Sequence, residues 1–255
     1  MLDLKELRNR AKGWMEEASE LSRRSFGKCE VEFKSDGSIV TDVDRQVEGL
    51  FRHWIRNSYP DHRILGEEYG IIAGKRGSDS PVWIIDPIDG TESYSMDLPT
   101  YAISLACYSE SECLYAIVAL PFVDKVLEYY ADGVYLNGMS LKRADLPLIS
   151  LLVSSNFHRH FAFKERNWST RCLGSFCFHA SYLLIGMCKA VLVVKASAWD
   201  LAGLYPMLKN HGFCLFNGHG EEILPNIGTT LRGVSEPFMI CHKDNKERFC
   251  GAIAF

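Results

Sequence analysis

The sequence predicts a mixed fold, with α+β character in its first half and α/β character in its second. Apolar residues recur every three or four positions in residues 4–21 and 43–55, which is the spacing of amphipathic helices. Short apolar runs separated by turns follow over residues 63–130. In the second half, helix-type and strand-type patterns alternate, as they do in α/β proteins.

The composition is that of a globular protein and excludes several functional classes. The 255 residues include 28 Lys and Arg against 32 Asp and Glu, a formal charge of −4, and 47% are hydrophobic. Nucleic-acid binders that neutralise phosphates usually carry a basic excess, so we expect no nucleic-acid partner. The charged start does not resemble a signal peptide, and no apolar run reaches the roughly 20 residues that span a bilayer. We therefore expect no membrane partner.

The nine cysteines form no Cys-x-x-Cys pair. An odd, scattered set predicts reduced and mostly buried thiols, and hence a cytoplasmic protein.

The first half is expected to begin with two helices joined by an extended stretch. The first covers Leu4 to Leu21, and the second covers Val43 to Ile55 and ends at Tyr59, because the proline that follows disfavours helix. Between them, residues 38–41 are expected to be extended. If that conformation continues, Asp42 and Asp44 point to the same side.

The middle and the end of the chain are expected to form two further units. Residues 102–108, 114–120 and 126–130 predict successive antiparallel strands, because their connections are short. A helix near residues 175–187, a strand at 190–194 and a helix from about Trp199 follow. We expect an N-terminal α+β subdomain over residues 1–145 and a C-terminal α/β subdomain over residues 146–255, which together form one unit.

The segment Trp83 to Thr91 is the most informative for function. An apolar strand delivers Asp86 at its carboxyl end, and the proline after it stiffens the turn to Asp89. Two carboxylates placed in this way can converge on a cation, and such hard oxygen donors suit Mg²⁺. Gly90 permits the close approach of another group. Thr91 opens a segment whose free N–H groups would attract an anion.

Three further acidic elements strengthen this hypothesis. Glu67 follows another short strand, Asp44 lies at the start of the second helix, and Asp200 lies at the start of a later helix. Each of them alone is also explained as a cap or a surface turn. Together they predict an oxygen-donor cluster.

The stretches DGSIVTDVD, ILGEE, WIIDPIDGT and AWDLAG occur in an order and at a spacing that resemble the inositol monophosphatase family. The resemblance covers nearly the whole chain. It implies a fructose-1,6-bisphosphatase-like αβαβα layered sandwich and a Mg²⁺-dependent, lithium-sensitive phosphomonoesterase that acts on a small phosphate ester. It also allows a homodimer.

The resemblance implies a role for each motif residue and two or three Mg²⁺ per active site. The ligands of the first ion would be Glu67, Asp86, the carbonyl of Ile88 and, as a further candidate, the Thr91 hydroxyl. Those of the second would be Asp86, Asp89 and Asp200. Asp44, Thr91 and Glu67 would form the catalytic set, in which Asp44 and Thr91 orient and deprotonate the attacking water. The residues expected to bind phosphate or substrate are Gly90, Thr91, Gly174, Ser175 and Lys195.

The substrate is less well determined, because the chain departs from the family pattern. Val193 stands where inositol phosphatases often carry an acid, and Phe176 stands where a small residue is typical. Lys195 could meet an anionic group of the substrate or could be a solvated lysine at a strand end. Inositol monophosphate is the default substrate. Histidinol phosphate and 3′(2′),5′-bisphosphorylated nucleotides are alternatives.

Four other interpretations have less support in the sequence. A regulatory member with a macromolecular partner would keep the fold but need not use the acidic cluster. Asp42 and Asp44 also resemble the nucleophile motif of haloacid-dehalogenase-type phosphatases, whose other motifs are missing, and a serine hydrolase would need a G-x-S-x-G elbow. The segment His158 to His160 is better explained as an exposed loop than as a metal site.

Overall fold

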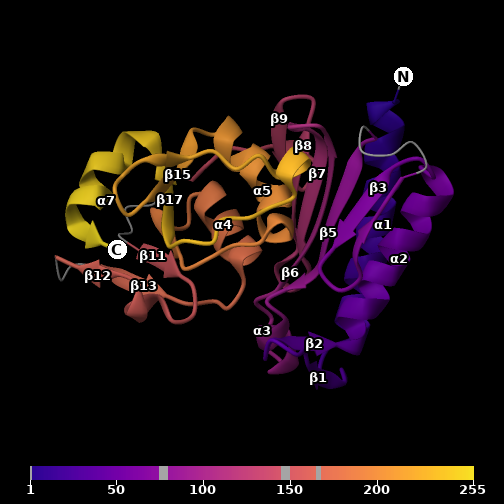
Figure 1. The fold of residues 1–255 in the computed structure, drawn as a ribbon, viewed down its shortest axis with the longest axis horizontal. Helices are drawn as coiled ribbons and strands as arrows, with labels where there is room; N and C mark the ends of the chain where they lie inside the picture. The colour runs from indigo at the N-terminus through magenta and orange to yellow at the C-terminus, as the bar shows by residue number, and fades with distance from the viewer. Residues whose placement is uncertain (1, 75–79, 145–149, 165–167) are drawn as a thin grey trace.

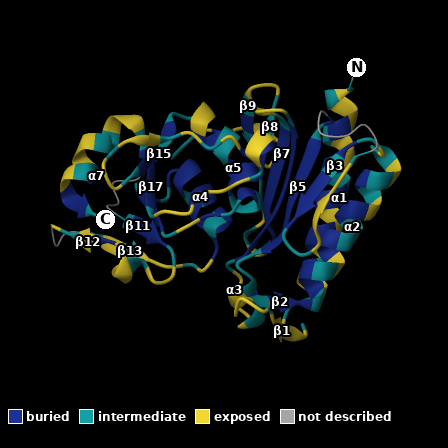
Figure 2. Cartoon of the chain, viewed as in Figure 1, coloured by how far each residue is buried: buried dark blue, intermediate teal, exposed yellow. Residues whose placement is uncertain are grey.

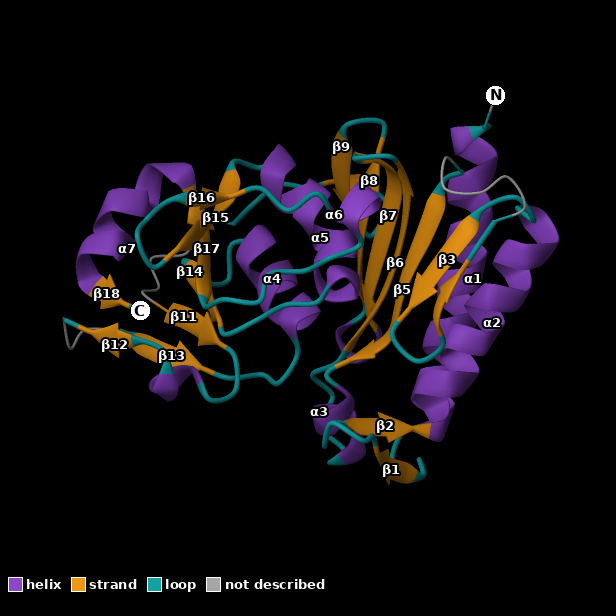
Figure 3. Ribbon diagram, in the orientation of Figure 1, coloured by secondary structure: helices purple, strands orange, loops and turns teal. Residues whose placement is uncertain are grey.

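The computed structural model describes residues 2–74, 80–144, 150–164 and 168–255. The helices and sheets alternate in five layers, which confirms the predicted αβαβα sandwich (Figure 1). Helices α1 (Leu4–Ser25) and α2 (Asp42–Ser58) cover the outer face of the first sheet. Helices α4 (Phe176–Leu184) and α5 (Ala198–Asn210) lie between the two sheets, and α7 (Lys246–Ala252) covers the far side of the second (Figure 3).

The first sheet has eight strands, and all its neighbours are antiparallel except β3 and β5. In spatial order the strands are β10 (Met139–Ser140), β9 (Gly133–Leu136), β8 (Lys125–Tyr130), β7 (Glu112–Leu120), β6 (Ala102–Ser109), β5 (Val82–Asp89), β3 (Arg63–Gly66) and β4 (Gly70–Ile72). The predicted antiparallel run over residues 102–130 is therefore confirmed.

The second sheet has six strands, and β11 runs parallel to both of its neighbours. In spatial order the strands are β13 (Ser169–Arg171), β11 (Ser150–Val153), β14 (Ala190–Val193), β17 (Phe238–His242), β15 (Phe213–Asn217) and β16 (Glu222–Ile223). Two small antiparallel pairs complete the strands, β1 (Val31–Phe33) with β2 (Ile39–Thr41) and β12 (Ala162–Phe163) with β18 (Ile253–Ala254). Two short helices are α3 (Thr91–Ser95) and α6 (Ile227–Thr230).

Alternate residues of β5 face the two sides of the first sheet. Trp83 and Ile85 pack under α1 and α2, whereas Val82 and Ile84 pack against the central helices. This period of two buries the strand on both faces, and each such side chain contributes about 1.5–3 kcal/mol when fully buried. The resulting layers of buried residues flank the sheet (Figure 2). The strand that carries Asp86 is thus held rigidly from both sides.

Two local expectations were wrong. Asp42 and Asp44 do not continue an extended segment, because Thr41 caps α2 and both acids lie in its first turn. The residues from Asp86 to Asp89 do not form a free turn either. They belong to β5, where the pairing with β6 shifts register between Asp86 and Asp89. Pro87 has no N–H to donate, so the ladder is interrupted while the backbone stays extended.

Other expectations have simpler outcomes. The predicted subdomain boundary at residues 145 and 146 lies outside the described residues. All nine cysteines are free, but only Cys107, Cys177, Cys188 and Cys241 are buried. Within the described ranges, no helix combines the length and the apolar character needed to cross a bilayer.

Candidate metal centre and active site

Glu67 and Asp86 lie side by side where the pairing of β3 with β5 ends. Strands β3 and β5 are parallel, and their pairing ends with Gly66 opposite Ile85. The next residue on each strand is an acid, so the two side chains emerge together at the carboxyl edge of the pair. This register explains why two motifs 19 positions apart supply one site.

The Asp86 carboxylate is buried and lacks a hydrogen-bond partner. The residue is 1% exposed, and neither Oδ1 nor Oδ2 contacts a donor among the described residues. Burial and the nearby charges of Glu67, Asp89 and Asp200 raise its pKa well above the usual value for aspartate. An unpaired buried carboxylate is unfavourable by several kcal/mol. A cation bound at this position would remove that cost, so the residues present fit a divalent metal.

Asp89 is oriented by the start of α4. Its Oδ2 accepts hydrogen bonds from the hydroxyl of Ser175, at 2.7 Å, and from the N–H of Cys177, while Oδ1 lies 3.3 Å from the N–H of Phe176. Burial raises its pKa, and these hydrogen bonds oppose the rise. The helix N-terminus thus fixes the carboxylate and leaves Oδ1 with only a long contact.

Asp200 is fixed at the start of α5. It lies at the third position of the helix, and its Oδ2 accepts the Ser197 N–H at 2.7 Å in a capping box. Burial and the charge of Asp89 raise its pKa to about 7. Burial raises the pKa of Glu67 further, to about 8. Four carboxylates with raised pKa values therefore lie near one another, which is the electrostatic character of a cation site.

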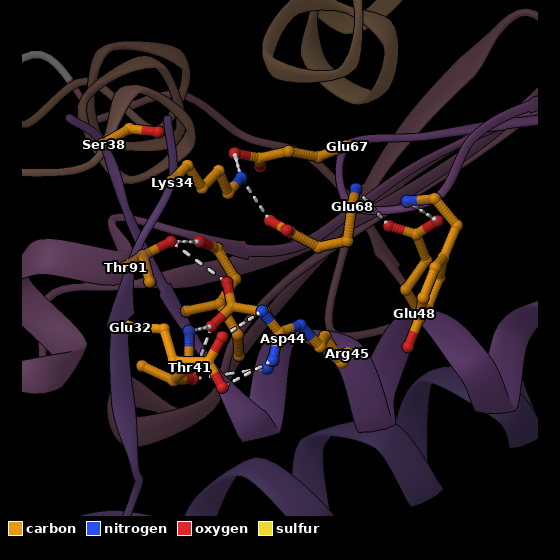
Figure 4. Close-up of polar contacts among 12 residues, drawn as sticks. Glu32, Lys34, Ser38, Thr41, Asp44, Arg45, Glu48, Glu67, Glu68 and Thr91 are labelled. Atoms are coloured by element: carbon orange, nitrogen blue, oxygen red, sulfur yellow. Dashed lines mark hydrogen bonds and ion pairs between the residues drawn. The ribbon is translucent and has the colours of Figure 1, made fainter. Parts of the chain in front are cut away.

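Thr91 links α3 to the start of α2. Its Oγ1 lies 3.0 Å from Asp44 Oδ1 and 2.9 Å from the carbonyl oxygen of Ile88, so it can donate to either (Figure 4). The other oxygen of Asp44 accepts from the N–H of Thr41, at 2.9 Å, and from its hydroxyl. Burial raises the pKa of Asp44 to about 6. Asp44 therefore completes the capping box of α2 and is a buried carboxylate one hydrogen bond away from Thr91.

Lys34 was not assigned a role from the sequence, yet it lies in this site. Its Nζ is 2.7 Å from Glu68 Oε1 and 3.2 Å from Glu67 Oε1 (Figure 4). The β1–β2 hairpin brings it there. Only its position in the DGSIVTDVD neighbourhood could have pointed to it, because a lysine before a turn is usually solvated.

Glu48 and Arg52, for which no role was predicted from the sequence, form a brace under the β3–β4 loop that carries Glu67. The buried Glu48 of α2 accepts the N–H groups of Glu68, at 2.7 Å, and Tyr69, at 3.2 Å. Arg52 donates to Glu48 at 2.6 Å and also bonds the carbonyl of Gly70. The brace fixes the backbone of the loop on which Glu67 lies.

Gly90 and Gly174 bring two loops into direct contact. A Cβ on Gly90 would lie 2.9 Å from the Cβ of Ser175, and a Cβ on Gly174 would lie 1.9 Å from Ser93 Oγ. Both glycines have positive φ, of +92° and +80°. The groups that approach Gly90 are therefore the Cβ of Ser175 and the carbonyl oxygens of Gly174 and Thr100.

A cavity of about 390 Å³ opens beside Ser175. Lys195, Arg159 and His160 line it, and no acid is among its lining residues. The complete lining is Ser154, Ser155, Asn156, Arg159, His160, Gly174, Ser175, Phe176, His179, Val193, Val194 and Lys195. The predicted loop at His158 to His160 is exposed, but Arg159 and His160 reach this cavity, which the sequence did not indicate.

The chain is similar to known proteins over nearly its whole length. The family model described as "Inositol monophosphatase family" matches residues 3–254. A fructose-1,6-bisphosphatase/inositol-1-monophosphatase of Thermotoga maritima is 29% identical over 194 residues, which cover 72% of this chain and 73% of that protein. A Nus factor SuhB of Pasteurella multocida is 30% identical over 203 residues, covering 72% of this chain and 74% of that protein.

Solved structures show the same fold. An IMPase/NADP phosphatase complexed with Mg²⁺ and phosphate superposes with a TM-score of 0.80 at 20% identity and covers 97% of this chain and 95% of that one. The family match covers residues 3–254. It agrees with the structure, in which the four acidic motifs converge around Asp86. The chain belongs to the inositol monophosphatase family and has the fold of its phosphatases.

Proposed function

We propose that this protein is a Mg²⁺-dependent phosphomonoesterase that hydrolyses a small phosphate ester. The observation that carries the proposal is the buried, unpartnered carboxylate of Asp86, surrounded by three further acids. Such a cluster of hard oxygen donors suits Mg²⁺, which is commonly completed by a substrate phosphate. The phosphatase family of the chain supports the same reaction class.

Two groups of ligands share Asp86. Glu67, Asp86 and the carbonyl of Ile88 would hold one ion, with the Thr91 hydroxyl as a further candidate ligand. Asp86, Asp89 and Asp200 would hold a second. When bound, two such ions neutralise phosphate charge and stabilise the attacking and leaving oxygens of an in-line displacement.

Asp44 and Thr91 would handle the proton of the attacking water. Thr91 Oγ1 donates to Asp44, which leaves its lone pairs free to accept a hydrogen bond from water. The proton would pass through the Thr91 hydroxyl to Asp44. With a pKa of about 6, Asp44 is a stronger base than an ordinary aspartate and is still ionised near neutral pH. Lys34 would orient Glu67 and oppose the rise in its pKa.

The phosphate would lie at the start of α3. Gly90 is the N-cap of this helix and Thr91 its first residue, and the first N–H groups of a helix have no intrahelical partner. Such groups bind phosphate oxygens. Gly90 and Thr91 are therefore proposed as phosphate-binding residues, and the contact with Gly174 and Ser175 holds them in place.

The leaving group would lie in the cavity beside Ser175. Lys195 and Arg159 give this cavity a positive lining, and Val193 contributes an apolar surface where an acid would bind hydroxyls. This lining favours an ester with a second anionic group, such as a bisphosphorylated nucleotide. It disfavours histidinol phosphate, whose leaving group carries an ammonium. Inositol monophosphate remains the reference substrate of the family.

The test is phosphate release across a panel of substrates with Mg²⁺ or with EDTA. The panel contains inositol monophosphates, histidinol phosphate, sugar phosphates and 3′,5′-bisphosphorylated nucleotides. We expect turnover of at least one ester with Mg²⁺, none with EDTA, and none from the double variant Asp86→Asn, Asp200→Asn. Activity that persists in EDTA and in the double variant would overturn the proposal.

A further inference from the structure

Cys177 lies where the metal-binding carboxylates converge. Its Sγ and carboxylate oxygens of Asp86 and Asp89 all lie within 4.8 Å of one another. The thiol is buried and donates to the backbone carbonyl of Asp200 at 3.4 Å. Its nearest charges are those of Asp89, Asp86 and Asp200. Cys177 also belongs to the buried apolar cluster between the two sheets, so its thiol lies at the boundary between that cluster and the three carboxylates.

We propose that Cys177 is a metal ligand in this protein and that it makes the Asp86–Asp89 site selective for a thiophilic divalent cation, of the Zn²⁺, Co²⁺ or Cd²⁺ class, over Mg²⁺. The inference rests on the carboxylates of the proposed function but concerns a different ligand and a different ion.

The geometry fits one ion bound by sulfur and oxygen. Zinc–sulfur bonds are about 2.3 Å and zinc–carboxylate bonds about 2.0–2.2 Å, so two ligands on one ion lie at most about 4.5 Å apart. The separations around Cys177 reach this range with a small side-chain adjustment. The independent sign of a missing ligand is Asp86, whose two oxygens are buried without a partner.

Local structure positions the thiol for this role. Cys177 is the second residue of α4, after the N-cap Ser175, and its Sγ lies within 4.8 Å of carboxylate oxygens of Asp86 and Asp89. Its own N–H bonds Asp89, which fixes both residues relative to each other. When the ion binds, the S–H bond breaks, a metal–sulfur bond forms and the proton is released to solvent. No redox step is involved.

The consequence is competition between cations at one site. Thiolate ligands favour zinc, whereas Mg²⁺ prefers oxygen alone. A sulfur ligand should therefore raise the affinity for Zn²⁺ while leaving that for Mg²⁺ little changed. Replacing Cys177 by alanine should weaken Zn²⁺ binding by about 10-fold to 100-fold and change Mg²⁺ binding by about twofold or less.

Cobalt spectroscopy tests the sulfur contact directly. Co²⁺ is added to metal-free wild type, Cys177→Ala, Cys177→Ser and Cys188→Ala. Cys188 is the matched control, because it is also buried but has Arg143 and Lys189 as neighbouring charges and no acid. We expect a near-ultraviolet sulfur-to-cobalt charge-transfer band in wild type and Cys188→Ala, and its loss in both Cys177 variants. Circular dichroism checks that each variant is folded.

Calorimetry with Zn²⁺ and Mg²⁺ then measures selectivity. Cobalt binding to wild type without the charge-transfer band, no cobalt binding at all, or a band that survives in Cys177→Ala would each overturn the inference. The same preparations assayed for phosphate release with Mg²⁺ test the proposed function separately. Turnover without a charge-transfer band rejects the thiol ligand alone, and a band without turnover rejects the phosphatase proposal alone.

Discussion

The hydroxyl of Thr91 lies 3.0 Å from Oδ1 of Asp44, and this hydrogen bond joins the first residue of α3 to the first turn of α2. The other oxygen of Asp44 accepts hydrogen bonds from Thr41, so the proposed base has one oxygen directed to Thr91. The two residues are 47 positions apart in the chain. Their contact is what a proton path from water to a buried carboxylate requires.

Replacing Thr91 by valine should remove this path while keeping the side-chain shape. We expect kcat to fall about 10²-fold to 10⁴-fold, the usual contribution of a positioned acid or base. Thr91→Ser keeps the hydroxyl and should stay within about tenfold of wild type. Steady-state phosphate release with the best ester of the panel measures both. A valine variant as active as the serine variant would show that the hydroxyl does not carry the proton.

Replacing Asp86 by asparagine should stabilise the metal-free protein while abolishing turnover. The neutral side chain removes an unpaired buried charge, and stability should rise by a few kcal/mol in EDTA near pH 8. Thermal melting in EDTA measures the change. Asp124→Asn is the control, because Asp124 is exposed with φ of +49°, a conformation that asparagine tolerates. A lower melting temperature for Asp86→Asn than for wild type would contradict the argument.

Stability without metal should decrease as pH rises. Asp44, Asp200 and Glu67 have pKa values of about 6, 7 and 8, mainly through burial. Unfolded carboxyl groups titrate near 4, so the folded state binds more protons between about pH 4 and 8. Its stability is therefore highest below that window and is lost as pH rises through the folded values. Mg²⁺ should reverse the loss, because it replaces the protons.

Melting curves with and without Mg²⁺ at about pH 5.5 and about pH 8 test this. We expect Mg²⁺ to raise the melting temperature more at the higher pH. An equal shift at both values would mean that protons and Mg²⁺ do not compete at the same carboxylates.

Local signals in the sequence were sufficient for the main helices, the antiparallel strands and the acidic motifs, whereas the αβαβα layering was implied by the family resemblance. Periodicity predicts the helices and the antiparallel strands, because burial on one face or both is a local pattern. The contacts of Lys34 with Glu67 and of Glu48 with Glu68 were not predictable. They depend on how the β1–β2 hairpin and α2 pack against the β3–β4 loop. Likewise, the sequence contains no signal for the contact between Gly174 and Ser93, because these residues lie in loops that are far apart in the chain.

Lys195 should contribute to substrate choice through charge. An exposed lysine near an anionic group contributes up to about 1 kcal/mol, so Lys195→Met should raise KM about threefold to fivefold for esters with a second anionic group. KM for esters with a neutral leaving group should stay unchanged. Lys209→Met is the control, because Lys209 is also exposed and lines a different cavity. Equal effects on both ester classes would show that Lys195 does not contact the leaving group.

The brace under the Glu67 loop should control Mg²⁺ affinity. A methyl group on Gly66 would lie 2.0 Å from Glu48 Oε1 and 2.3 Å from its Cδ, so Gly66→Ala must displace the carboxylate that holds the Glu68 N–H. Because Glu48 is buried and bonded to Arg52, it cannot move without breaking these contacts. We expect the Mg²⁺ concentration for half-maximal activity to rise about 10-fold to 100-fold, as for other supports of metal ligands.

Gly49→Ala is the matched control, because it lies beside Glu48 in the same helix and its Cβ would meet no atom within 4 Å. Alanine should stabilise α2 by about 0.5–1 kcal/mol and leave the Mg²⁺ requirement unchanged. Titration of activity with Mg²⁺ and thermal melting of both variants separate the two effects. If Gly66→Ala lowers the melting temperature but keeps the wild-type Mg²⁺ requirement, then Glu48 supports the fold and does not position Glu67.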